Sequence, residues 1–220
     1  MATTLNFDNL NVLDSKTVKK SRAIPYRQYF GEMYITPEEM RSRIRLAEEI
    51  EDVMLYVFAY WAIAASAELS IEELRQDAKE KMRSVLGKHT KIDSYLEQHI
   101  DNVIDEVIES TATHTAGLEE SEAGYWLSSD RAMLIAENEA NAFGNYVEYR
   151  EAKARGKTKK TWITELDDKV RLTHTLEEGK TIDIDGLFFV GGSQMRFPKD
   201  TEYNPDASEV VNCRCTCEYS

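Results

Sequence analysis

The sequence predicts an α+β protein, with a helical N-terminal region followed by a smaller α+β domain that contains a short antiparallel sheet. Helical patterns with recognisable capping residues run from residue 36 to Gly156, and short β-type runs take over after that glycine. Because helices precede strands instead of alternating with them, a parallel sheet is not expected. A polar stretch at 111–129 separates the two parts, so we place the domains at 1–118 and 119–220.

The first predicted helix has a clear start. Thr36 can cap it, Pro37 takes the first helical position, and Glu39 completes a capping box, so the helix should run to about Ala67. Later capping residues, glycine stop signals and apolar residues at helical spacing indicate three more helices. These are expected at 70–87, 91–110 and 130–155.

Short β-forming runs dominate the last third of the chain. Strands are expected at 160–164, 181–184, 187–190 and 210–219. Asp185-Gly186 signals a hairpin between the second and third of these runs, and Gly191-Gly192 should end that hairpin. Trp162 is expected to anchor the core of this part, as large aromatic residues usually do.

The composition limits the classes of function. The chain has 40 acidic residues and a formal net charge of -13, which argues against a general nucleic-acid binder and favours a basic protein partner. Residues 1–14 lack the basic start and apolar run of a signal peptide, which predicts a cytoplasmic protein or a particle assembled in the cytoplasm. The whole segment 1–34 is interpreted either as an arm that orders against a partner or as a packed extension.

One apolar segment tests for a membrane span. Residues 53–67 carry no charge over 15 positions, whereas a spanning helix needs about 20 apolar residues. Acidic residues close the segment on both sides, so we expect a buried helix and no stable membrane span.

All three cysteines of the chain lie at the C-terminal end, at Cys213, Cys215 and Cys217. On an extended strand this spacing turns the three thiols to one face. One metal ion, zinc being the usual choice, could take two of them easily and all three only if the strand bends. The alternatives are three small buried side chains in a core strand or a redox role, although a disulfide between residues i and i+2 has poor geometry.

A basic cluster surrounds the end of the fourth predicted helix. It comprises Arg150, Lys153, Arg155, Lys157, Lys159 and Lys160. The helix dipole favours cations at this end without any partner. A local contact with DNA or with an acidic surface is the alternative interpretation.

Two short elements together resemble a known family. They are the run Asp167-Asp168-Lys169-Val170-Arg171-Leu172-Thr173-His174 and the terminal Asn212-Cys213-Arg214-Cys215. Over roughly residues 125–219 the chain resembles the phage head-morphogenesis family, the Mu-F-like minor head proteins. The residues of this resemblance that we expect to have structural roles are Arg131, Glu139, Trp162, Asp167, Arg171, Asn212 and Arg214.

The resemblance implies a non-enzymatic minor head protein that acts in capsid assembly and in DNA packaging or ejection. The partners it implies are the portal protein, the major capsid protein, or both, with a local contact to DNA at most. It places the protein in the virion head, and in the host cytoplasm during assembly.

The resemblance also implies that His174 is the ligand that joins Cys213, Cys215 and Cys217 around a metal ion, with Asp167 as a further ligand or an orienting partner of the histidine. A site filled by three thiolates and a histidine would be purely structural. An open metal position would favour the alternative function, a zinc- or His-dependent hydrolase or a toxin-like effector carried by the particle. Arg214 and Arg171 are expected to pair internally, with Asp167 or Glu139.

Overall fold

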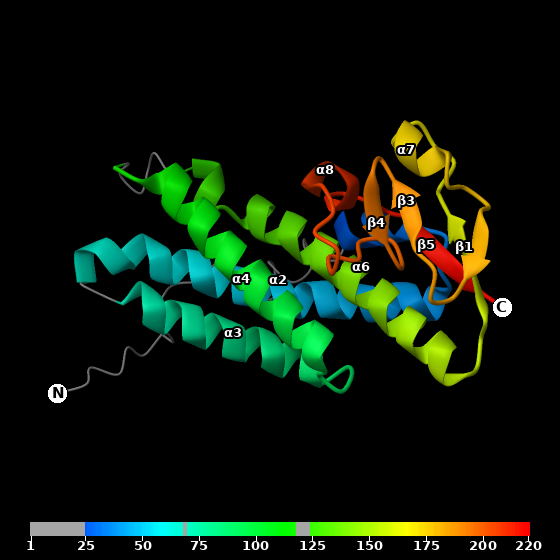
Figure 1. The fold of residues 1–220 in the computed structure, drawn as a ribbon. Helices are drawn as coiled ribbons and strands as arrows, with labels where there is room; N and C mark the ends of the chain where they lie inside the picture. Colours follow the sequence, from blue (N-terminus) through cyan, green and yellow to red (C-terminus); the bar gives the residue numbers. More distant parts are fainter. Residues whose placement is uncertain (1–24, 68–69, 118–123) are drawn as a thin grey trace.

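The computed structural model describes residues 25–67, 70–117 and 124–220, and it confirms the α+β fold. The long helices form a bundle, and the strands gather at one end of it (Figure 1). The helices are α2 (Pro37–Ala67), α3 (Ile71–Gly87), α4 (Ser94–Thr115), α6 (Ser129–Ala154), α7 (Leu172–Thr175) and α8 (Ala207–Val210), with the 3-10 helix η2 (Gly124–Leu127). The strands are β1 (Lys159–Ile163), β2 (Thr181–Asp183), β3 (Phe188–Val190), β4 (Ser193–Met195) and β5 (Thr216–Tyr219).

Capping side chains fix the starts of the long helices. Thr36 and Glu39 form the predicted capping box at α2, with each side chain accepting a hydrogen bond from the other residue's backbone amide at 3.2 and 2.6 Å. Ser70 caps α3 as predicted. The third predicted helix starts late, because the carboxylate of Asp93 caps α4 by accepting from the Leu96 amide. It also continues to Thr115, so the polar stretch begins inside a helix.

Arg131 shows that the predicted domain boundary is crossed by tight packing. Its guanidinium donates to the hydroxyls of Ser110 and Thr111 at the end of α4 and to the Trp126 carbonyl in η2, each at 2.7–2.8 Å. The same group lies over the rings of Phe58 and Trp126, at 4.8 and 4.9 Å from their centroids. Arg131 therefore ties the first turn of α6 to α2, α4 and η2.

The apolar segment of α2 is buried in the bundle, as predicted. Val53, Met54, Val57 and Phe58 are at most 4% exposed, and α2 packs mainly along α6 and α3. Across the described ranges we find no helix whose length and apolar character would suffice for a membrane crossing.

The sheet has the order β2-β1-β5, with both neighbours antiparallel to β1. The predicted hairpin at Asp185-Gly186 is wrong, because β2 pairs with β1, while β3 pairs with β4 across Gly191-Gly192. Gly191 and Gly192 have φ of 57° and 90°, the backbone that a tight two-residue hairpin loop requires. The loop at Gly186 is held by Lys160 instead. The buried ammonium of Lys160 donates to the carbonyls of Ile184 and Gly186, each at 2.7 Å.

The last predicted strand is shorter than expected. Only Thr216–Tyr219 forms β5, and α8 occupies the start of the predicted run. Between them lies an irregular segment, 211–215, in which Asn212 has a φ of 57°. The chain therefore turns before Cys213, and the thiols do not line up along one strand.

The first prediction concerns Glu137, whose carboxylate lies on α6 close to Glu51. Burial, and then the charge of Glu51, raise the pKa of Glu137 to about 7. A raised folded-state pKa stabilises the fold below the unfolded value, and this contribution is lost as the pH rises through about 7. Glu137→Gln should therefore stabilise the protein by on the order of 1 kcal/mol at pH 8.5 and by less at pH 5.5.

Urea unfolding at the two pH values measures this difference. Glu109→Gln, which replaces an exposed glutamate on α4, serves as the control and should show the same small change at both. An equal effect of Glu137→Gln at the two pH values would contradict the prediction.

Candidate metal centre

His174, Cys213 and Cys215 form a buried cluster whose ligand atoms all lie within 4.8 Å of one another. Nδ1 of His174 is 3.3 Å from Sγ of Cys215 and 3.6 Å from Sγ of Cys213. Each of these residues is at most 3% exposed. One imidazole and two thiols are ligands typical of zinc sites, so the cluster can bind a metal ion.

The structure does not bring Cys217 into this cluster. Cys217 lies in β5, paired in register with Trp162 of β1. The irregular segment before β5 turns the first two thiols to His174 and leaves the third among core side chains. Of the four predicted ligands, three are therefore brought together.

Glu209 orients the histidine. Its Oε2 lies 3.0 Å from Nε2 of His174 and accepts a hydrogen bond of 2.8 Å from the Thr173 hydroxyl. A carboxylate on one imidazole nitrogen directs the other nitrogen to a metal ion, an arrangement common around bound zinc. Asp167, expected in this role, lies elsewhere. The sequence gives little signal for Glu209, because it lies in a four-residue helix far from His174 along the chain.

A glycine makes room for Glu209. A Cβ atom on Gly191 would lie 2.1 Å from Oε1 of Glu209, which no side-chain carbon can do without displacing that carboxylate. Gly191 and Gly192 thus allow the tight β3–β4 turn, and Gly191 also leaves room for the Glu209 carboxylate.

Asparagines of α6 fix the backbone around the two thiols. The side-chain amide of Asn141 donates to the Cys213 carbonyl at 2.8 Å, and that of Asn145 donates to the Cys215 carbonyl at 3.1 Å. Asn138 accepts from the Asn212 amide at 2.7 Å. Neighbouring turns of one helix therefore determine where both thiols lie.

The groups of the cluster shift one another's pKa values. A hydrogen bond from Cys215 lowers the pKa of the Cys213 thiol against the effect of burial, and His174 and Lys199 lower it further. The hydrogen bond to Cys213, with burial, raises the pKa of Cys215. For His174, burial lowers the pKa, but the interactions with Cys213 and Glu209 outweigh it and raise the pKa. The direction of the shift at Cys213 favours its thiolate, the form that ligates metals.

Arg214 has one of its predicted carboxylate partners, whereas Arg171 has a backbone carbonyl in place of Asp167 or Glu139. Arg214 donates to both carboxylate oxygens of Asp167 at 2.7 and 2.8 Å, and to Glu32 at 3.0 Å. Arg171 donates to the Val211 carbonyl. These contacts brace the segments on either side of the metal cluster, and Asp167 serves Arg214 rather than His174.

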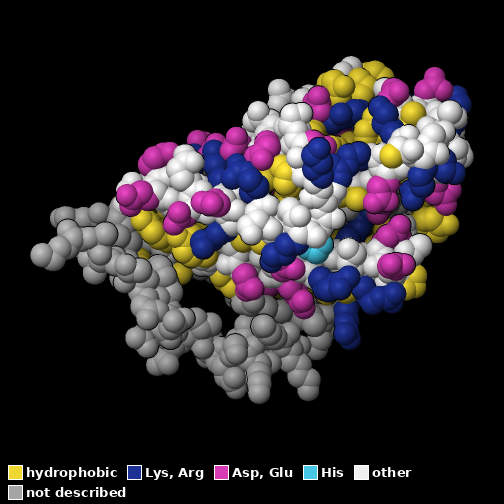
Figure 2. All heavy atoms as spheres, turned by 90° about the horizontal axis from the view of Figure 1, so that it is seen from below, with side chains coloured by type: hydrophobic (Ala, Val, Ile, Leu, Met, Phe, Trp, Pro, Cys, Tyr) yellow, Lys and Arg dark blue, Asp and Glu magenta, His cyan; other side chains and the backbone are white. Residues whose placement is uncertain are grey.

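Residues of the predicted basic cluster have acidic or carbonyl partners. Arg150 pairs with Asp93, Lys153 with Asp185, Arg155 with Glu151, and Lys159 with Asp183. Lys160 is fully buried, and burial lowers its pKa to about 8. On the face in Figure 2, lysines and arginines lie among acidic side chains. A DNA contact at this cluster stays a prediction.

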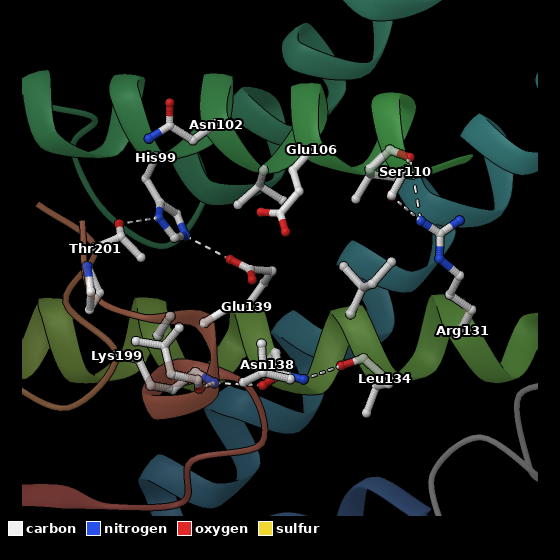
Figure 3. Close-up of a pocket in the computed structure, with 18 of the residues that line it drawn as sticks. His99, Asn102, Glu106, Ser110, Arg131, Leu134, Asn138, Glu139, Lys199 and Thr201 are labelled. Carbon is white, nitrogen blue, oxygen red and sulfur yellow. Dashed lines mark hydrogen bonds and ion pairs between the residues drawn. The ribbon is translucent and has the colours of Figure 1, made fainter. Parts of the chain in front are cut away.

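A second feature is a cavity of about 490 Å³ between α4, α6 and the segment 199–211. Figure 3 shows His99 of α4 and Glu139 of α6 facing each other across it, with 2.7 Å between Nε2 and Oε2. Burial raises the pKa of Glu139. The charge and hydrogen bond of His99 and the charge of Lys199 lower it by more, so the pKa lies below its ordinary value. The shift favours the ionised form of Glu139, whose carboxylate lines a largely apolar cavity. The sequence suggested a structural role for Glu139 but did not reveal the cavity.

Comparison with known proteins gives one informative similarity. The chain is 37% identical over 102 residues to an NAD(+)--arginine ADP-ribosyltransferase EFV from Enterococcus faecalis (strain ATCC 700802 / V583). The match covers 44% of this chain and 20% of the relative, so the chain spans about a fifth of that protein's length. No family model and no solved structure matches the chain.

This similarity corrects the interpretation of the sequence. The predicted membership of the phage head-morphogenesis family, the function in head assembly and the absence of enzymatic activity are contradicted by a relative that is named as an enzyme. The resemblance depended on short motifs, whose residues in the structure form an Arg–Asp pair and a His–Cys cluster. The predicted portal and capsid partners and the location in a virion stay predictions.

A prediction follows from the contact between Gly191 and Glu209. Gly191→Ala adds a methyl group that displaces the carboxylate and also strains a backbone with positive φ. Gly192→Ala is the matched control, because its φ is +90° but its Cβ would meet nothing within 4 Å. The control should cost about 1 to 2 kcal/mol, and Gly191→Ala roughly 1 to 3 kcal/mol more. Urea unfolding of both variants measures the difference, and equal losses would show that Glu209 does not need the glycine.

Proposed function

We propose that this chain is part of a toxin-like effector and takes part in the transfer of ADP-ribose from NAD+ to arginine. The observation that carries this proposal is the 37% identity to the ADP-ribosyltransferase. The match covers a fifth of that relative, so the activity that we assign to this chain is a proposal.

The cavity between α4 and α6 is our candidate for the NAD+ site. Its volume of about 490 Å³ falls in the range of small-molecule sites, which are mostly apolar with a few polar groups. Val103, Val107 and Ile135 supply apolar wall, and Tyr125 and Trp126 supply aromatic rings at one end. An aromatic base or a nicotinamide ring can pack against such surfaces.

Glu139 is placed to act on the ribose. When the bond from ribose C1′ to nicotinamide breaks, its electron pair leaves with nicotinamide and positive charge develops on the sugar. A half-buried carboxylate in its ionised form stabilises that charge, as acidic residues do in glycoside cleavage. A guanidinium nitrogen of the acceptor arginine then bonds to C1′ and gives up a proton. Glu106 also lines the cavity (Figure 3) and can accept that proton.

We further propose that the metal ion at His174, Cys213 and Cys215 is zinc. Two sulfur ligands and one imidazole nitrogen match its preferences, and Glu209 supplies the partner that zinc-bound histidines usually have. Bound zinc would stabilise the C-terminal part, in which the ligands come from segments some 40 residues apart in sequence.

The enzymatic proposal is tested with NAD+ and agmatine, a small guanidine acceptor. The purified protein should release nicotinamide and form ADP-ribosyl-agmatine. Glu139→Gln should lower the rate about 100-fold or more, because the neutral amide cannot offset the charge on the sugar. Glu109→Gln, which changes an exposed glutamate of α4, should leave the rate unchanged.

Calorimetric titration with NAD+ completes this test. A folded protein that neither binds NAD+ nor forms the product would show that the shared segment lies outside the catalytic part of the relative. Activity that survives in Glu139→Gln would leave the transferase proposal standing and remove Glu139 from it.

The zinc proposal is tested by metal content and thermal unfolding. Cys213→Ser and Cys215→Ser should each lose most of the bound zinc and melt on the order of 10 °C lower. Cys217→Ser is the matched control, because it changes a buried thiol next to the cluster and should keep about one zinc per chain. Equal zinc content in all three variants would reject the assigned ligands.

A further inference from the structure

Among the residues that the structure describes, the metal cluster has no fourth protein ligand. Within the ranges that the structure describes, the group of neighbouring His, Cys, Asp and Glu ligand atoms at this site contains His174, Cys213 and Cys215 alone. Zinc takes four ligands, and sites with three protein ligands keep the fourth position for water or substrate. The ligand set therefore resembles an open site rather than a closed structural one.

A small hollow adjoins the three ligands. It has a volume of about 10 Å³, and His174, Cys213 and Cys215 all line it. The other lining residues are Glu165, Lys169, Val170, Arg171, Asn212 and Arg214. A volume of about 10 to 15 Å³ is the room that one water molecule requires. The hollow thus offers space beside the ligands for one water or an ion of similar size.

Among the cations in the wall of the hollow, Arg171 has a backbone carbonyl and not a carboxylate as its described partner. Two thiolates balance the charge of Zn²⁺. The electrostatic potential in the hollow therefore depends on the charged side chains in its wall. Arg214 is neutralised by Asp167 and Glu32, and Lys169 also pairs with Glu32. Arg171 binds the Val211 carbonyl, which does not cancel its charge. Glu165 is a carboxylate in the same wall; it accepts from the Tyr34 amide at 2.7 Å, and this neutral donor leaves its negative charge in place.

From these observations we propose that the metal centre keeps an exchangeable fourth position, filled by water or hydroxide, that small monovalent anions can occupy. This inference depends on the proposed zinc site and is independent of ADP-ribosyl transfer. It assigns to Arg171 the role of attracting and orienting the anion. Metal-bound water is acidic enough to serve as a nucleophile near neutral pH, which gives the position a chemical use.

The experiment replaces zinc by Co²⁺ in the full chain and follows the absorption spectrum. Intense thiolate-to-cobalt bands should appear at one equivalent of metal. Titration with azide should then shift the visible cobalt bands to saturation, because azide replaces the bound water. Arg171→Gln should keep the metal stoichiometry and weaken azide binding about fivefold, whereas Cys217→Ser should behave like the unchanged protein.

The outcomes separate the two proposals. A protein without thiolate-to-cobalt bands would reject the metal site itself. Normal bands that do not respond to azide would overturn the open position while the metal site stands. In that event Glu165→Gln identifies the cause, since a response to azide in this variant alone would show that Glu165 occupies the fourth position in the metal-bound protein.

Discussion

Hydrogen bonds from α6 to the backbone of the cysteine segment are the constraint on which the rest of the structure depends. Asn141 and Asn145 are at most 1% exposed, and their amides hold the carbonyls of Cys213 and Cys215. Their side-chain oxygens accept from the buried guanidinium of Arg43 on α2. Since each asparagine must satisfy both sides, α2, α6 and the C-terminal segment can combine in one register only.

Arg43, Asn141 and Asn145 form a polar layer between α2 and α6. This layer explains why the core contains a charged side chain. A buried arginine is costly unless it is paired, and Arg43 also forms an ion pair with Glu148, while its Nε has no hydrogen-bond partner among the described residues. Gly144 provides the space, because a Cβ there would lie 2.6 Å from Nε of Arg43. An apolar layer would bury the same surface but would tolerate a shift of α6 along α2. The hydrogen bonds of the polar layer fix the position of α6 along α2. They therefore also fix the positions of the Cys213 and Cys215 thiols.

Local patterns predicted the parts of the fold whose causes are local. Thr36 and Glu39 interact over three residues, and the start of α2 was therefore readable. The hairpin was misassigned because Asp185-Gly186 and Gly191-Gly192 are both turn signals, and long-range pairing with β1 decides between them. The sequence predicted that His174 would meet two of the cysteines, and the structure brings them together. Glu209 was not, because 35 residues separate it from His174 and no spacing marks it.

The metal cluster and the large cavity share a wall. The ammonium of Lys199, which lines the cavity, donates to Asn138 at 2.6 Å and to the Val210 carbonyl at 2.7 Å. Asn138 in turn accepts from Asn212, the residue before Cys213. A ligand that draws Lys199 toward the cavity would remove one of the two donors that Asn138 accepts from and loosen the turn that carries the thiolate. The cavity and the metal cluster are thus connected through Lys199, Asn138 and the backbone amide of Asn212.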